Sequence, residues 1–100
     1  MTDTRRIQPA IYILASQTHG TLYMGVTSDL IQHVWQHKNN LAQGFTQKYC
    51  VRMLVYFELH AAILNAFTRE KQLKAGSRAK KVSLIEGVNL DWADLYPSCL

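Results

Sequence analysis

Glu70 is the position of this sequence at which chemistry is most clearly indicated. The stretch from residue 61 to 74 contains no Pro or Gly and is predicted to form a helix. Glu70 falls within the inner stripe of that helix, whose apolar members are Ile63, Ala66, Phe67 and Leu73. A carboxylate on such a face is costly to bury unless a cation, a metal or a hydrogen-bond donor accompanies it. Two interpretations remain open: an ion pair with Lys74, one turn later, or a functional acid.

Two tyrosines and a glycine provide the second group of candidate residues. A four-residue turn at 17–20 between two β-rich segments would pair Tyr12 with Gly25 and would place Tyr12 and Tyr23 on one face as diagonal neighbours. Glycine inside a strand often marks the close approach of another group. The two phenols beside bare backbone could form the floor of a substrate site. Alternatively, tyrosine is simply a good strand residue, and the glycine only relieves crowding.

These side chains must be positioned by a small set of elements. We expect strands at 10–16 and 21–27, a helix at 30–38 with N-cap candidates at 27–29, a polar loop at 39–49, a strand at 51–58, the Glu70 helix at 61–74, and a last helix at 78–86 that Ser77 caps and that stops at Gly87. This order, β-β-α-β-α-α, predicts an α+β fold in which helices flank a three-stranded antiparallel sheet. Residues 1–9 are expected to form a loose N-terminus, residues 10–95 a single domain, and residues 96–100 a tail.

Length and composition limit the class of protein. One hundred residues, 48% of them hydrophobic, are enough for one compact core and too few for two. No segment resembles a signal peptide, and no apolar run is long enough to span a membrane. Cys50 and Cys99 show no CxxC spacing, so we expect reduced thiols in a cytoplasmic protein. The net charge of +4 favours an anionic partner.

The positive charge is concentrated around the Glu70 helix. Between Leu59 and Ile85, Glu70 is the only acid, and the basic residues are Arg69, Lys71, Lys74, Arg78, Lys80 and Lys81. Such a cluster suits a phosphate backbone, to which contacts are electrostatic and independent of sequence. The alternative is a solvated helix face.

The motifs, taken in order, resemble the GIY-YIG nuclease superfamily. Ala10-Ile11-Tyr12 and Tyr23-Met24-Gly25 are similar to the paired motif that names the superfamily, with alanine in place of the first glycine. The likeness continues through Asp29-Leu30, Val34-Trp35-Gln36-His37-Lys38, Gly44-Phe45-Thr46, Lys48-Tyr49, residues 54–58, Ala66, residues 69–74 and Asn89. It covers residues 10–95 and is closest to the small stand-alone bacterial members.

This resemblance implies a metal-dependent phosphodiesterase that acts on DNA. Glu70 matches the glutamate that holds a divalent cation, and Mg²⁺ or Mn²⁺ suits one carboxylate together with waters and substrate oxygens. Tyr12 and Tyr23 match the tyrosines beside the phosphate, and one of them is a candidate for activating the attacking water. His37 matches a histidine that could assist proton transfer. Asn89 matches a late asparagine that supports the site.

The nucleic-acid contacts are predicted to be non-specific in sequence, because no recognition domain is added to the catalytic unit. The residues expected to make them are Gly25, Lys38, Arg69, Lys71, Lys74, Arg78, Lys80 and Lys81. The sequence leaves open whether the DNA is duplex, branched or single-stranded, whether RNA is accepted, and which protein partners exist.

His33 departs from the family pattern. The family carries an arginine four residues before the histidine that His37 matches, where it stabilises charge on the phosphate. A histidine is shorter, single-pronged and mostly neutral at pH 7. Losing such a donor costs about 2–4 kcal/mol in the transition state. Three interpretations therefore stay open: an endonuclease weakened by His33, a catalytically inactive DNA-binding relative, or a zinc site built on the spacing His33-x-x-x-His37.

Overall fold

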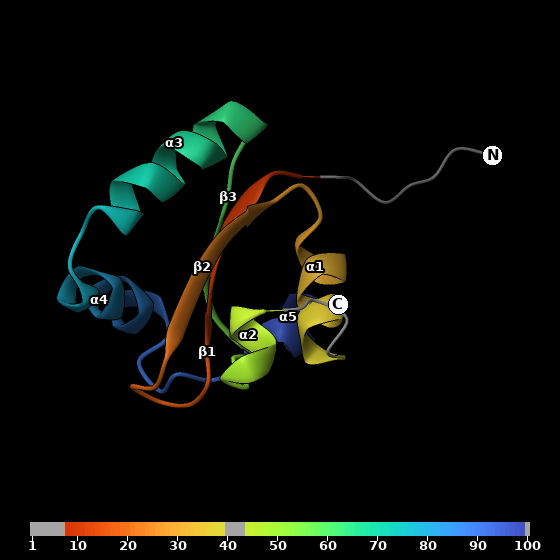
Figure 1. Cartoon of the computed structure of the whole chain (residues 1–100). Helices are drawn as coiled ribbons and strands as arrows, with labels where there is room; N and C mark the ends of the chain where they lie inside the picture. The colour runs from red at the N-terminus through yellow and green to blue at the C-terminus, as the bar shows by residue number, and fades with distance from the viewer. Residues whose placement is uncertain (1–7, 40–43, 100) are drawn as a thin grey trace.

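The computed structural model describes residues 8–39 and 44–99, and it contains a three-stranded antiparallel sheet. The strands are β1 (Ala10–Ala15), β2 (Leu22–Thr27) and β3 (Met53–Leu59), in the spatial order β2-β1-β3 (Figure 1). Every residue of the central strand β1 is buried, which fits its run of apolar side chains with a single tyrosine. β2 lies at an edge of the sheet, so its outer side is not covered by another strand and side chains from the helices can approach it.

The register of the hairpin is the one that the sequence predicted. Tyr12 pairs with Gly25, and Leu14 pairs with Tyr23. The turn is closed by Ser16, whose backbone N–H donates to the Thr21 carbonyl at 3.0 Å and whose Oγ accepts from the Thr21 N–H at 2.9 Å. Because side chains alternate between faces along a strand, this pairing places Tyr12 and Tyr23 on one face.

Five helices surround the sheet in the described residues: α1 (Leu30–Lys38), α2 (Phe45–Lys48), α3 (Ile63–Lys74), α4 (Arg78–Val88) and α5 (Tyr96–Cys99). The predicted order β-β-α-β-α-α is confirmed for the longer elements. The predicted caps also hold, since Asp29 accepts from the Gln32 N–H at 3.3 Å and Ser77 accepts from the Lys80 N–H at 3.2 Å. No helix among the described residues is long and apolar enough to cross a membrane.

Several boundaries differ from the prediction, among them the start of β3, which is at Met53 and not at 51, and the start of α3, which is at Ile63 and not at 61. The expected loop 39–49 contains the single-turn helix α2, and its positions 40–43 lie outside the described residues, as do 1–7 of the expected loose N-terminus. The expected tail contains the single turn α5. Helix α4 runs through Gly87 to Val88, because Asn89, whose N–H donates to the Ile85 carbonyl at 2.7 Å, supplies the stop signal in place of the glycine.

The two faces of the sheet carry separate cores. One face packs Ile11, Ile13 and Val55 against residues of α3 and α4, including Ala66 and Ile85. The other face packs Tyr12, Leu14 and Leu54 against Leu30 and Val34 of α1. Figure 1 shows α3 and α4 on one side of the strands and α1 and α5 on the other. A carboxylate on α3 can therefore meet a side chain from the α1 face only around a sheet edge.

The predicted inner stripe of the Glu70 helix is correct in its C-terminal half and wrong in its N-terminal half. Ala66 is buried, and Glu70 and Leu73 are half-buried. Ile63 and Phe67 are instead 37% and 46% exposed. The reason is that α3 packs on β1 and β2, while its first turn follows directly from the end of β3 and extends past the strands (Figure 1).

Candidate active site

Four rings from three elements gather on the α1 face of the sheet. Tyr12 comes from β1, Tyr23 from β2, and His33 and His37 from consecutive turns of α1. The ring centroid of Tyr12 lies 6.3 Å from that of Tyr23, 5.4 Å from that of His33 and 6.2 Å from that of His37. His37 also lies 5.8 Å from Tyr23 and 5.0 Å from His33. The sequence-predicted tyrosines and histidines therefore form one cluster.

Gly25 allows Tyr12 to reach the open edge of the sheet. A Cβ atom built on Gly25 would lie 2.4 Å from the Tyr12 Oη and 2.7 Å from its Cζ. The phenol thus lies directly against the glycine backbone, and its hydroxyl is directed across the edge strand. The group that approaches Gly25 is therefore Tyr12 itself, so the glycine relieves crowding in a way that fixes where the phenol points.

Glu70 brings a carboxylate from the opposite face toward this cluster. Its side chain is only 15% exposed, and its negative charge is one of the causes that raise the pKa of Tyr12. Its Oε2 also lies 3.1 Å from the Lys74 Nζ, so the ion pair considered from the sequence is present. The two interpretations of Glu70 are compatible, because the same carboxylate pairs with an exposed lysine and lies close enough to Tyr12 to affect its proton.

Burial shifts the pKa values of three of the four rings toward the uncharged form. It is the main cause that raises the pKa of Tyr12 far above its ordinary value, and the charges of Tyr23 and Glu70 add to it. Burial also lowers the pKa of His33, against an opposing effect of Asp29, and lowers that of His37, where His33 adds to the effect. Both imidazoles are consequently neutral at pH 7 and able to accept a proton. Tyr12 in this state is a hydrogen-bond donor and not a base.

Asn89 lies elsewhere, at the end of α4. Its side-chain amide donates to the carbonyls of Val55 at 3.0 Å and Ala93 at 2.8 Å, and its Oδ1 accepts from the Ala93 N–H at 3.0 Å. These contacts tie the segment after α4 to β3. The structure thus gives Asn89 a supporting role in the fold and does not bring it to the four rings.

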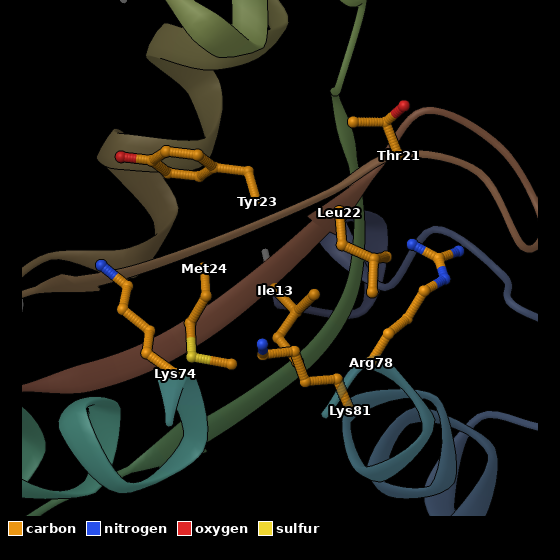
Figure 2. A pocket seen from close by; sticks show the side chains of 8 residues that line it. All are labelled: Ile13, Thr21, Leu22, Tyr23, Met24, Lys74, Arg78 and Lys81. Carbon is orange, nitrogen blue, oxygen red and sulfur yellow. The ribbon is translucent and has the colours of Figure 1, made fainter. Parts of the chain in front are cut away.

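Several of the predicted nucleic-acid contacts have partners within the protein, among them Lys74 through its ion pair with Glu70. Lys38 forms an ion pair with Asp94 and donates to the Arg52 carbonyl at 3.1 Å. Arg69 binds the carboxylate of Glu58 through Nε at 3.0 Å and Nη2 at 3.0 Å. The side chains of Lys71 and Lys80 are exposed. Lys74, Arg78 and Lys81 surround a pocket of about 610 Å³ beside β2, shown in Figure 2.

A polar network around Glu58 is a feature that the sequence reasoning missed. The carboxylate accepts from Tyr56 Oη and from Arg69, and His60 Nε2 lies 3.3 Å from its Oε1. Burial alone would raise the pKa of Glu58, but these hydrogen bonds outweigh it and hold that pKa below its ordinary value. Burial and the bond to Glu58 raise the pKa of Tyr56 to about 12. The signal available in the sequence was the spacing of these polar residues at every second position near the end of β3, which places their side chains on one face.

The donor set fits a hard cation better than zinc. Within the ranges 8–39 and 44–99, no three His, Cys, Asp or Glu side chains lie close enough to form a metal site, so a zinc site on His33 and His37 has no third protein ligand there. Glu70 offers one carboxylate whose charge acts on the phenol of Tyr12. That is sufficient for Mg²⁺ or Mn²⁺, which keep several waters and take substrate phosphates as ligands.

The fold and the edge cluster define a small α+β domain whose site combines phenols, imidazoles and one carboxylate. The chain belongs to the GIY-YIG catalytic domain family, whose family model matches residues 8–83. It is 33% identical over 75 residues to a UPF0213 protein of Staphylococcus saprophyticus. This alignment covers 75% of this chain and 90% of the relative. It is 30% identical over 79 residues to UPF0213 proteins from two strains of Pseudomonas aeruginosa, with 79% of this chain and 75% of each relative covered. No solved structure gives a significant match.

Proposed function

We propose that this protein is a metal-dependent DNA endonuclease. Membership of the GIY-YIG family indicates a nuclease-type function and a nucleic-acid substrate. The observation that carries the finer proposal is that the Glu70 carboxylate lies near enough to Tyr12 for its charge to raise the pKa of that phenol, while two neutral imidazoles lie beside Tyr12. This arrangement supplies a cation ligand, a hydrogen-bond donor and proton acceptors at one place.

Each side chain has a distinct part in the proposed hydrolysis. Glu70 would hold Mg²⁺ or Mn²⁺, which when bound supplies Lewis-acid stabilisation of the phosphate. Tyr12, whose raised pKa keeps it protonated, donates to a phosphate oxygen. His37, whose lowered pKa keeps it neutral, is able to accept a proton from water directly or through Tyr23, whose ring centroid lies 5.8 Å away.

His33 makes the activity weaker than that of a relative with arginine at this position. Its lowered pKa leaves it neutral at pH 7, so it offers no fixed positive charge to the phosphate. The same observation supports the second candidate function, a DNA-binding protein without catalysis. We place either activity in the cytoplasm, in keeping with Cys50 and Cys99, which are both free thiols.

A nicking assay tests the proposal. Supercoiled plasmid is incubated with the protein and Mg²⁺ or Mn²⁺, and Glu70→Gln is compared with Asp91→Asn, a matched loss of one carboxylate at an exposed position outside the cluster. We expect metal-dependent nicking that Glu70→Gln abolishes and Asp91→Asn retains. DNA binding without nicking by the wild-type protein in either metal would refute the endonuclease and leave the binding protein.

A further inference from the structure

The pocket beside β2 combines an apolar floor with a basic rim. Ile13, Leu22 and Met24 form the apolar part, and Figure 2 shows Lys74, Arg78 and Lys81 extending toward it from the two helices below. We infer that this pocket binds one nucleotide unit, with the base on the apolar floor and its phosphate on the cationic rim. The inference rests on the proposed function, because it places a nucleotide of the substrate beside the edge cluster.

The floor is built from the sheet itself and is therefore fixed. Ile13 is fully buried and Met24 is 7% exposed, while Leu22 is half-buried at the start of the edge strand. Figure 2 shows Tyr23 on the other side of β2 from Met24, as alternation along a strand requires. An apolar ring that enters this pocket would cover the part of Leu22 that faces water, and the hydrophobic effect favours such burial.

The rim presents charge in a defined geometry. Arg78 Nη2 donates to the carbonyls of His19 at 3.0 Å and Gly20 at 2.7 Å, so its guanidinium is held against the hairpin turn with other N–H groups still available. The Lys81 Nζ lies 3.4 Å from the Gly76 carbonyl at the junction of α3 and α4. Among the described residues no carboxylate lines the pocket, but the Glu70 Oε2 lies 3.1 Å from the Lys74 Nζ, so Arg78 and Lys81 are the rim cations that attract an anion most strongly.

The combination of floor and rim selects among possible ligands. A bare phosphate would use the cations and leave the apolar surface exposed, and an uncharged apolar molecule would gain nothing from the cationic rim. A nucleotide uses both surfaces. The volume of about 610 Å³ lies within the range of about 300–1,000 Å³ that is typical of small-ligand sites. Tyr23 and Lys74 line the pocket and also border the cluster, so a bound nucleotide would adjoin the phosphate held there.

Titration of the full-length protein with small probes tests this inference without DNA or metal. Thymidine monophosphate, thymidine and inorganic phosphate are compared by calorimetry or by NMR shift changes. We expect the monophosphate to bind at least tenfold more tightly than either part alone. Lys81→Gln should weaken its binding about tenfold, because it removes a charge-assisted hydrogen bond to the phosphate. Lys48→Gln, at an exposed position of α2 outside this pocket, is the matched control and should leave affinity unchanged.

A second variant separates the floor from the rim. Leu22→Asn should weaken thymidine monophosphate and leave inorganic phosphate unaffected. Equal affinities for the monophosphate and for phosphate, equal effects of the two lysine variants, or no binding of any probe would each overturn the inference. A protein that binds the monophosphate but never nicks DNA would retain this inference and lose the endonuclease. A protein that nicks DNA but does not bind the monophosphate would retain the endonuclease and lose this inference.

Discussion

Replacing Gly25 with alanine would place a methyl group where the phenol of Tyr12 lies. The new Cβ would be 2.4 Å from the Tyr12 Oη, 2.7 Å from its Cζ and 3.1 Å from its Cε1. Ordinary van der Waals contact begins at 3.4 Å, so the hydroxyl must move by the difference from 2.4 Å, which is about 1 Å. Tyr12 is 1% exposed and packed among His33, His37 and Tyr23, so the ring has no free space in which to move.

Two magnitudes follow from this displacement. Overpacking of a well-packed core costs about 1–3 kcal/mol, so Gly25→Ala should lower the free energy of unfolding by that amount. A misplacement of about 1 Å at a reacting centre costs up to a hundredfold in rate, so nicking should fall by a factor of about a hundred. Urea denaturation measures the first quantity, and the plasmid assay measures the second.

Gly87→Ala is the matched control, because a Cβ at Gly87 meets nothing within 4 Å and the residue lies within helix α4. It should raise the free energy of unfolding by up to about 1 kcal/mol through helix propensity and leave nicking unchanged. If Gly25→Ala proves as stable as the wild type, Tyr12 does not lie over Gly25 and the geometry argued for the edge is wrong. If Gly25→Ala is destabilised but still nicks at the full rate, Tyr12 has no part in the mechanism.

Three further outcomes are expected. His33→Arg should raise nicking about tenfold or more while DNA affinity changes much less, because the added charge acts mainly in the transition state; an unchanged rate would refute this role. The lowered pKa of Glu58 means that the folded state holds its proton less tightly than the unfolded state, so this stabilisation is present above about pH 4.5 and is lost as the pH falls below it. Glu58→Gln should therefore make the loss of stability in acid less steep, as measured by circular dichroism against pH. An acid transition as steep as that of the wild type would count against the network. Lys71→Gln with Lys80→Gln should reduce the salt dependence of DNA affinity by up to about two in log–log slope, and affinity that does not respond to salt would exclude phosphate contacts.

The hairpin shows which part of the site can be predicted from sequence. A turn of fixed length between two alternating segments determines every cross-strand pair, so the opposition of Tyr12 and Gly25 follows from local pattern alone. Glu70 was predictable for a similar reason, since a carboxylate in an apolar stripe conflicts with its surroundings. The exposure of Ile63 and Phe67 was not, because helical periodicity cannot show where a helix extends past its sheet.

The basic residues show the limit of the same reasoning. Lys38 and Arg69 have the charge of nucleic-acid contacts, and their sequence neighbourhood does not distinguish them from Lys74 or Lys81. Their actual partners lie at a sequence separation of 56 for Lys38 and Asp94, and of 11 for Arg69 and Glu58. Such pairs depend on tertiary packing, which no local window contains. A patch of charge in sequence therefore overstates the surface available to a phosphate backbone.

The Arg69–Glu58 pair also explains how Glu70 comes to face the edge cluster. Consecutive residues on a helix are about 100° apart, so a contact that fixes Arg69 on one flank of α3 also fixes the direction of Glu70. Arg69 is held at 3.0 Å by two of its nitrogens against β3, on one side of the buried Ala66. Glu70 is thereby turned toward β2 and β1, the strands that α3 contacts. The side of α3 that carries the Glu70 carboxylate is thus set in part by an ion pair that does not itself touch the four rings.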